Sequence, residues 1–282
     1  MEVVTMTFKI DGFLGAQTEQ TESIPSTPVA ETTAPRKSVV QVKFPEHGTG
    51  LAYFNDSFDL KVGDRVYVDG KMAGKLGCVT AVNYNFKIKR SEIQKVIACC
   101  DTNVRGQFYV ADAHFVAFDP KVLSVEQVRL WFRSPEGEDG EYVCGSDDTS
   151  FSLDDPRGMN VSPAIAQRGH HYYLENRVRF INLHGTHGFA IVEGTENYIV
   201  EFEYHNGRIS QLFCDCYCTY NCKHEVAVLL QLADLLDWIE EYHQDEYLRT
   251  GYFSAVDKAT MFRFAVEGKE HGSFDLNLAF SN

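Results

Sequence analysis

The sequence predicts an α+β protein, in which a small antiparallel β-barrel precedes a β-meander packed against a helix. Three observations support this prediction. Short alternating runs broken by Gly and Asp turns fill much of the first half, alternating runs return after residue 165, and a long helical apolar pattern begins near residue 225. With 282 residues, 44% of them apolar, the chain can fill the cores of two folded parts.

Residues 1–37 are predicted to form a short strand followed by a disordered linker. The strand is VVTMTFKI, and the residues that follow it are rich in Thr, Glu, Pro and Ser. Such a segment has too little apolar surface to offset the entropy lost on ordering, so we expect it to connect the strand to the first folded part.

Residues 38–133 are predicted to form the β-barrel. In KVGDRVYVDGKMAGKLGCVTAV the Gly63-Asp64 pair indicates a turn, Val66 and Val68 alternate, and Gly70 and Gly74 interrupt the run. The segment KVGDRVYVDG resembles the opening of SH3-like barrels, in which a Gly-Asp turn leads into an alternating strand, and this resemblance implies a small antiparallel barrel. At the end of the range, SVEQVRLWF fits either a strand or a short helix.

Residues 134–164 are predicted to be an acidic connector. Eight Asp and Glu residues between 136 and 155 face one basic residue, Arg157. The ligand spacing of an EF-hand calcium loop is missing, so we interpret the segment as solvated chain.

Residues 165–282 are predicted to form a second domain. The strings HYYLENRVRFINLHG and GFAIVEGTENYIVEFEYHNGRISQLF indicate strands, with a hairpin turn at Asn206-Gly207. HEVAVLLQLADLLDWIEEY has a helical period, SAVDKATMFRFAVEG indicates a second helix, and SFDLNLAF a last strand.

Four residues between the last meander strand and the helix predict a metal site. In FCDCYCTYNCKHEVAVLL, Cys214 and Cys216 are spaced to point the same way from a strand end, and Cys222 and His224 open the helix. Three thiolates and an imidazole form a complete tetrahedral set for Zn²⁺, so we expect one structural zinc ion and no open catalytic position. Cys218 is the alternative ligand.

This segment resembles the SWIM zinc finger, with Cys-x-Cys, a loop, and Cys-x-His opening a helix. The upstream strings RGHHYYLENRV and GFAIVEGTENYIVEF also resemble bacterial SWIM proteins, including the phrase filled here by Val192, Gly194, Thr195, Tyr198 and Val200. The resemblance covers about residues 168–235, and it implies a module that binds protein or DNA.

Basic residues that could contact nucleic acid occur in two groups. The barrel group has Tyr84 and Phe86 nearby, and the second group falls on the expected strands of the second domain. The candidates are Lys87, Lys89, Arg90, Lys95, Arg168, Arg177 and Arg179.

The whole-chain charge and the absence of catalytic motifs favour a non-catalytic adaptor. The formal net charge is −14, which disfavours nucleic acid and leaves a protein as the expected partner. No nucleophile elbow, phosphate loop or paired-carboxylate motif is present, so an enzyme is the weakest alternative. No apolar run is long enough to span a membrane and the first residues do not fit a secretory signal, so we expect a cytoplasmic protein.

Overall fold

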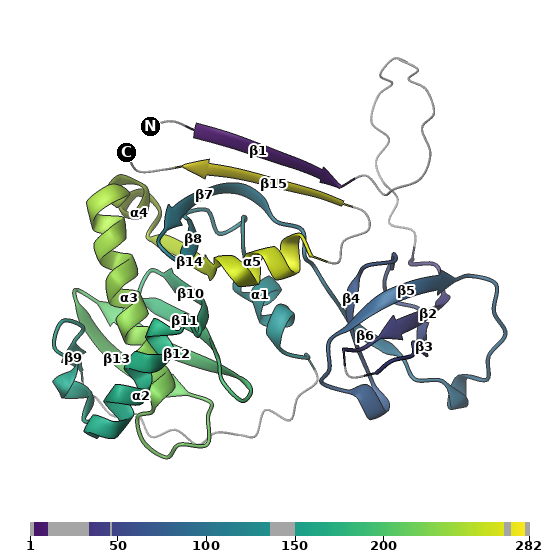
Figure 1. Cartoon of the computed structure of the whole chain (residues 1–282), viewed down its shortest axis with the longest axis horizontal. Coiled ribbons are helices and arrows are strands. Elements are labelled where there is room, and N and C mark those ends of the chain that lie inside the picture. Colours follow the sequence, from purple (N-terminus) through teal and green to yellow (C-terminus); the bar gives the residue numbers. More distant parts are fainter. Residues whose placement is uncertain (1–2, 11–33, 46, 136–149, 268–271, 280–282) are drawn as a thin grey trace.

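The computed structural model describes residues 3–10, 34–45, 47–135, 150–267 and 272–279. Within these ranges the chain has two β-sheets and five α-helices, so the predicted α+β class is confirmed (Figure 1). No helix in the described ranges is both long and apolar enough to cross a membrane.

The strands and helices alternate irregularly along the chain. The strands are β1 Val3–Ile10, β2 Ser38–Lys43, β3 Leu51–Asn55, β4 Arg65–Val68, β5 Gly77–Asn83, β6 Val96–Cys100, β7 Arg105–Ala111, β8 His114–Ala117, β9 Phe151–Ser152, β10 Val178–His184, β11 His187–Glu193, β12 Asn197–His205, β13 Arg208–Cys214, β14 Tyr252–Asp257 and β15 Gly272–Ala279. The α-helices are α1 Val125–Phe132, α2 Pro163–Leu174, α3 Lys223–Tyr242, α4 Gln244–Thr250 and α5 Lys258–Ala265.

The larger sheet has ten strands in the order β1-β15-β7-β8-β14-β10-β11-β12-β13-β9. Its neighbours pair antiparallel, except that β15 runs parallel to β7. The β10–β13 meander is the part that the alternating pattern predicts. Its turn at Asn206 and Gly207 has positive φ at both residues, as a tight hairpin requires.

Both faces of the meander are buried, because helices cover each side. On one face Ile181, Ala190 and Val200 pack with α3, and α2 lies against α3. On the other face Phe180 and Ile191 belong to a second core with α1 and α5. The strands are therefore rich in apolar residues on successive positions rather than strictly alternating.

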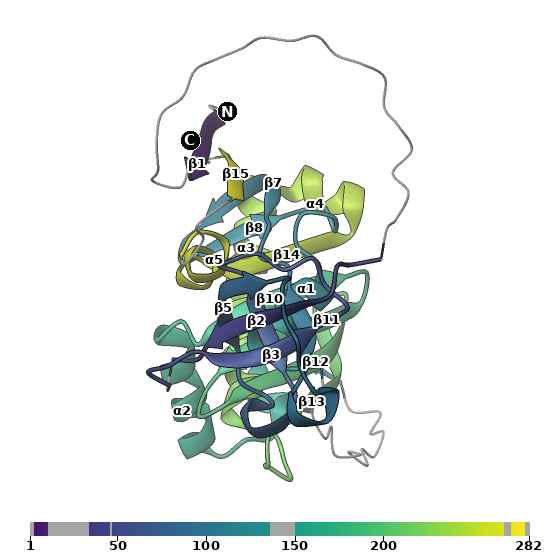
Figure 2. The ribbon, with the colours of Figure 1, turned by 90° about the vertical axis from the view of Figure 1, so that its right-hand side faces the viewer.

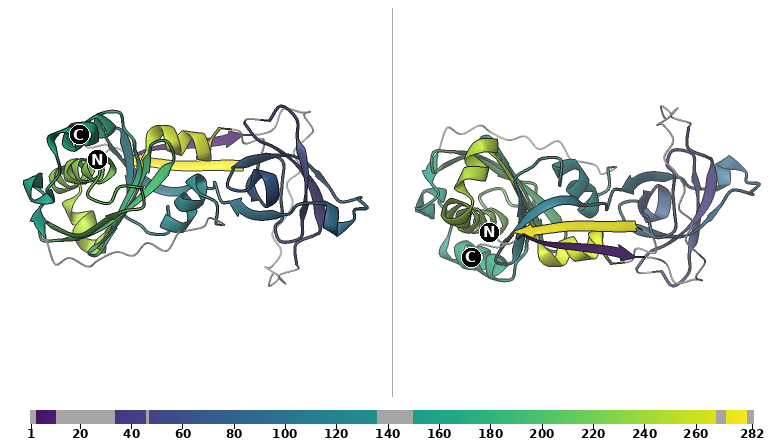
Figure 3. Two further views of the ribbon diagram at one scale, coloured as in Figure 1. Left: turned by 90° about the horizontal axis from the view of Figure 1, so that it is seen from below. Right: turned by 90° about the horizontal axis from the view of Figure 1, so that it is seen from above.

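The smaller sheet has five strands in the order β3-β2-β5-β4-β6 and its own core. Its two outer strands approach each other, because the Phe54 N–H donates to the Gln94 carbonyl at 2.8 Å and Phe54 forms a bridge with Lys95. The sheet lies at one end of the molecule (Figure 3), and this end faces the viewer in Figure 2. Its Tyr67 and Cys100 enter the core formed by Trp131 and Phe264, and this contact joins the two sheets.

Two local predictions were wrong. The Tyr-rich string before Arg177 is helix α2, not a strand, because Ser162 caps it and the helix packs on α3. The expected second helix is divided, because Tyr252–Asp257 is fully buried as β14 between β10 and β8. Asp257 then caps α5 by accepting the N–H groups of Ala259 and Thr260.

Sheet membership does not follow the predicted domain ranges. β7, β8 and α1 fall within the predicted barrel range 38–133, yet the two strands pair in the larger sheet. The ranges 1–37, 38–133, 134–164 and 165–282 stay predictions. Residues 11–33 of the expected linker and 136–149 of the acidic connector lie outside the described residues. The described residues 150–164 of the connector carry β9, which pairs with β13, and the start of α2.

Candidate metal centre

The four predicted ligands come together where β13 ends and α3 begins. Cys214 is the last residue of β13, Cys216 follows two residues later, and Cys222 and His224 stand at the start of α3. All four side chains are buried, and their ligand atoms lie within 4.8 Å of one another. The structure therefore gathers residues from a strand end and a helix start into one buried Cys₃His cluster that can hold a metal ion.

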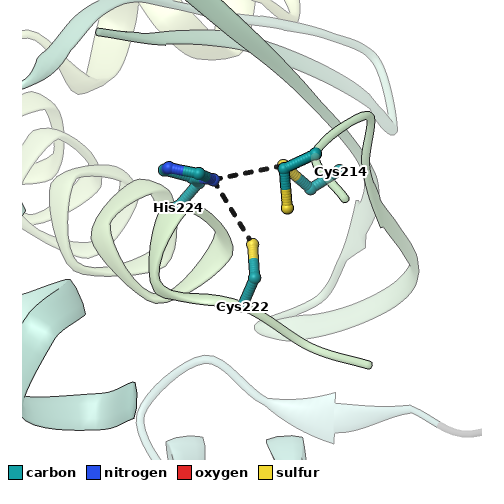
Figure 4. Close-up of side chains that lie close together, drawn as sticks. Cys214, Cys222 and His224 are labelled. Atoms are coloured by element: carbon teal, nitrogen blue, oxygen red, sulfur yellow. Dashed lines mark hydrogen bonds between the residues drawn. The ribbon is translucent and has the colours of Figure 1, made fainter. Parts of the chain in front are cut away.

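The distances within the cluster fit tetrahedral coordination of one ion. His224 Nδ1 lies 3.6 Å from Cys214 Sγ and 3.7 Å from Cys222 Sγ (Figure 4). Metal–sulfur and metal–nitrogen bonds of about 2.3 and 2.0 Å at a tetrahedral angle give a sulfur–nitrogen separation of about 3.5 Å. The side chains thus need little movement to share an ion.

The protons of the thiols are distributed unequally. The hydrogen bond with Cys214 lowers the pKa of Cys222, and the same contact together with burial raises the pKa of Cys214. Burial also raises the pKa of Cys216 to about 12. One thiolate is favoured without a cation, so full ionisation of the cluster calls for a positive ion at its centre.

Two aromatic rings hold the imidazole of His224. The ring of Tyr198 stacks on it with centroids 4.2 Å apart, and Tyr172 of α2 meets it edge-on at 5.5 Å. Nδ1 faces the sulfur atoms, while the buried Nε2 has no hydrogen-bond partner among the described residues. This orientation presents the Nδ1 lone pair to an ion and leaves the proton on Nε2.

Glycines allow these close approaches. A Cβ atom on Gly194 would lie 2.9 Å from Tyr198 Cε2, and one on Gly169 would lie 2.4 Å from Val226 Cβ. Gly194 therefore leaves room for the ring that stacks on His224, and Gly169 lets α2 touch the start of α3.

The backbone around the cysteines is fixed by two acidic side chains that the sequence did not single out for this role. Asp215 accepts the Ile199 N–H at 2.8 Å and forms an ion pair with Arg133, which ties the Cys214–Cys216 segment to β12 and to the end of α1. Glu225 is buried and accepts the Cys222 N–H at 2.6 Å, as in a capping box. Burial raises the pKa of Glu225 to about 8.

Cys218 lies apart from the cluster. It is exposed in the five-residue loop between Cys216 and Cys222, whereas the other three cysteines of the segment are buried. The same loop exposes Tyr217 and Tyr220, whose side chains are 92% and 86% accessible.

The seven basic candidates for nucleic-acid contact are not brought together. Four lie between β5 and β6 of the smaller sheet, and three lie on α2 or near the start of β10, at the other end of the molecule (Figure 1). Several are engaged in ion pairs: Lys89 with Glu92, Lys95 with Asp56, Arg177 with Glu175, and Arg179 with Glu193 and Asp257. The charge available to phosphate in either group is correspondingly reduced.

No protein-family model and no solved structure matches the chain. Over 90 residues it is 31% identical to Uncharacterized protein MJ1493 of Methanocaldococcus jannaschii. The match covers 32% of this chain and 34% of that protein, so the chain spans about a third of the relative's length.

Proposed function

We propose that this protein is a non-catalytic interaction module held together by one structural zinc ion, with a SWIM-type arrangement of Cys214, Cys216, Cys222 and His224. The observation that carries the proposal is the buried cluster of four protein ligands. Because the protein fills every tetrahedral position, a bound ion has no site for a reacting water, and its role is to fix the fold.

The ligand chemistry favours zinc over the harder divalent ions. Thiolate and imidazole suit Zn²⁺, whereas Mg²⁺ and Ca²⁺ prefer oxygen. Three thiolates with Zn²⁺ carry a charge of about −1, which the positive end of α3 stabilises. Lys223, at the first position of α3, adds a positive charge beside the cluster.

The loop between the ligand pairs supports an interaction role. Metal ligation at Cys216 and Cys222 would fix both ends of the loop. The loop would then lose its conformational entropy when the protein folds, and binding a partner would cost less entropy. Tyr217 and Tyr220 then present two accessible aromatic rings, a residue type enriched at protein interfaces. We propose a protein partner for this loop.

The smaller sheet is proposed to be an SH3-like barrel and a second interaction unit. The bridge between Phe54 and Lys95 brings its outer strands together, which supports closure. Direct nucleic-acid binding stays the alternative function, although the ion pairs of Lys89, Lys95 and Arg179 weigh against it.

The metal is tested by elemental analysis of purified wild type, Cys222→Ser and Cys218→Ser. We expect about one zinc per chain in the wild type and in Cys218→Ser, because Cys218 is exposed and outside the cluster. Cys222→Ser should lose the metal and unfold at a lower temperature, because metal binding is coupled to folding. Zinc retained in Cys222→Ser, or lost in Cys218→Ser, would contradict the assignment.

The role of the loop is tested by a pull-down from an extract of the native host. The proteins captured by the immobilised wild type are compared with those captured by a Tyr217→Ser, Tyr220→Ser double variant. We expect a specific partner to be captured by the wild type and lost by the double variant, with zinc content and melting temperature unchanged. Tyr242→Ser is the control, because Tyr242 is also exposed but lies at the opposite end of α3 from the loop. Equal capture by the wild type and the double variant would refute the role of the loop.

A further inference from the structure

A cleft of about 450 Å³ lies where the smaller sheet meets the larger one. The smaller sheet contributes Arg65 and Tyr67 of β4 and Lys75 of the following loop, and the larger part contributes residues of α1, α5 and the β11–β12 turn. Its volume is in the range of sites for single small molecules.

Among the described residues that line the cleft, basic side chains outnumber acidic ones, in contrast to the net charge of −14 for the chain. Arg65, Lys75 and Arg263 line it, and the only carboxylate among its lining residues in the described part of the chain is Glu193. Glu193 is already paired with Arg179 at 3.0 Å. Cations from β4, from the loop before β5 and from α5 therefore line the cleft beside a carboxylate that is already paired, which favours an anionic ligand.

Aromatic side chains form part of the lining of the cleft. Trp131 and Phe264 stack with centroids 4.9 Å apart, and Phe132 meets Phe264 edge-on at 5.7 Å. The exposed guanidinium of Arg263 lies 4.9 Å from the Phe264 centroid and 5.5 Å from the Phe132 centroid. A guanidinium held on aromatic rings is restricted in orientation and has a second planar face for stacking.

The remaining polar groups are also preorganised. Arg65 Nη2 donates to the Glu267 carbonyl at 3.5 Å, and Asn197 Nδ2 donates to the Phe132 carbonyl at 3.1 Å. These contacts fix side chains from both sides of the cleft, so a ligand would meet groups that have already lost much of their freedom.

We propose that this cleft binds a nucleoside phosphate. The phosphate would lie among Arg65, Lys75 and Arg263, and the base would stack on the Arg263 guanidinium near Phe132. A long nucleic acid is disfavoured, because the cleft offers three cations in a single small volume and the other basic candidates lie elsewhere. This ligand is independent of the zinc centre and of the Tyr217–Tyr220 loop.

The probes are ADP, adenosine and inorganic pyrophosphate, added to the full zinc-loaded chain while its tryptophan fluorescence, to which Trp131 of the cleft and Trp238 contribute, is followed. We expect ADP to bind with a Kd below about 1 mM. Adenosine and pyrophosphate should each bind at least about tenfold more weakly than ADP, because adenosine lacks the phosphates and pyrophosphate lacks the base. Pyrophosphate that binds as tightly as ADP, or ADP that does not bind, overturns the proposal.

Arg263→Gln and Lys75→Gln locate the site. Each removes one cation and should weaken ADP binding about tenfold, the loss expected for a hydrogen bond to a charged group. Lys75 is exposed in a loop, so its replacement leaves the aromatic packing intact. Arg157→Gln is the matched control, since Arg157 is exposed and outside the cleft, and it should bind ADP as the wild type does.

Unchanged ADP binding in both Arg263→Gln and Lys75→Gln refutes the proposal. A single-stranded oligonucleotide that binds when ADP does not refutes it in favour of a nucleic-acid surface. Zinc content is measured separately, so loss of this proposal leaves the metal assignment unaffected.

Discussion

The histidine of the metal centre depends on a residue that has no side chain. Gly194 lies beside the Tyr198 ring, and that ring stacks on His224. The glycine is thus part of the support of the ligand, although it contacts no metal. This arrangement gives a physical reason for a glycine at position 194 in the segment GFAIVEGTENYIVEF.

Replacing Gly194 with Ala should destabilise the centre through the ring. The new Cβ would lie 2.9 Å from Tyr198 Cε2 and 3.5 Å from His224 Nε2, so the stacked pair must shift. We expect the free energy of unfolding, measured by chemical denaturation, to fall by about 1–3 kcal/mol.

Gly48→Ala is the control for this substitution. Gly48 is exposed, and a Cβ there would have no described neighbour within 4 Å. The control should stay within about 0.5 kcal/mol of the wild type. A Gly194→Ala variant as stable as Gly48→Ala would show that the stacking does not support the fold.

At the scale of the elements, one histidine side chain links two strands of the larger sheet that are not direct neighbours. His114 of β8 is buried, and its Nε2 donates to the Val178 carbonyl of β10 at 3.0 Å, across the intervening β14. Burial lowers the pKa of His114. The hydrogen bond to the Val178 carbonyl and the nearby Asp257 and Asp112 carboxylates partly oppose this shift, and Arg179 adds to it. His114 is therefore neutral in the folded protein near pH 7.

This histidine should make the fold sensitive to acid. Above about pH 6.5 both the folded and unfolded chains hold neutral His114, and its contribution is fully present. As the pH falls below that value, the unfolded chain takes up a proton that the folded chain resists, so stability declines toward the lowered folded pKa. The slope from this residue is up to about 1.4 kcal/mol per pH unit.

The effect is measured as the free energy of unfolding of the wild type and of His114→Gln, by chemical denaturation between about pH 7.5 and about pH 5. Glutamine keeps an amide donor for the Val178 carbonyl but does not titrate, so the variant should lose stability less steeply as the pH falls. Equal slopes for the two proteins would show that His114 does not account for the acid sensitivity.

The elements best predicted from the sequence are those whose signal is local. The period of α3, the Asn206-Gly207 turn and the Cys and His spacing each lie within a short stretch of chain, and each has its counterpart in the structure. Helix α2 was missed because its Tyr residues favour a strand, while its packing on α3 depends on Gly169 and on residues far along the chain. The support of His224 was missed for the same reason, since Tyr172 reaches it only through that packing.

At the scale of the whole molecule, the sheet order could not be inferred from local patterns. β14 enters between β8 and β10, and β15 pairs with β7, so strands from both halves of the chain share one sheet. Alternation shows which residues share a face of a strand, but it does not show which strand becomes the neighbour. The two cores follow from this order, because it brings α1 and α5 to the face opposite α3.

The pairing of β1 with β15 and of β15 with β7 also sets an order of events during synthesis. β1 and β7 leave the ribosome long before β15, their shared neighbour, exists. Until then both strands have unpaired backbone groups along an edge, the kind of edge that recruits other chains. Completion of the larger sheet is therefore a late step. It is also expected to be slow, because contacts between residues far apart in the sequence slow folding. Newly made chains are most prone to misassembly before this step.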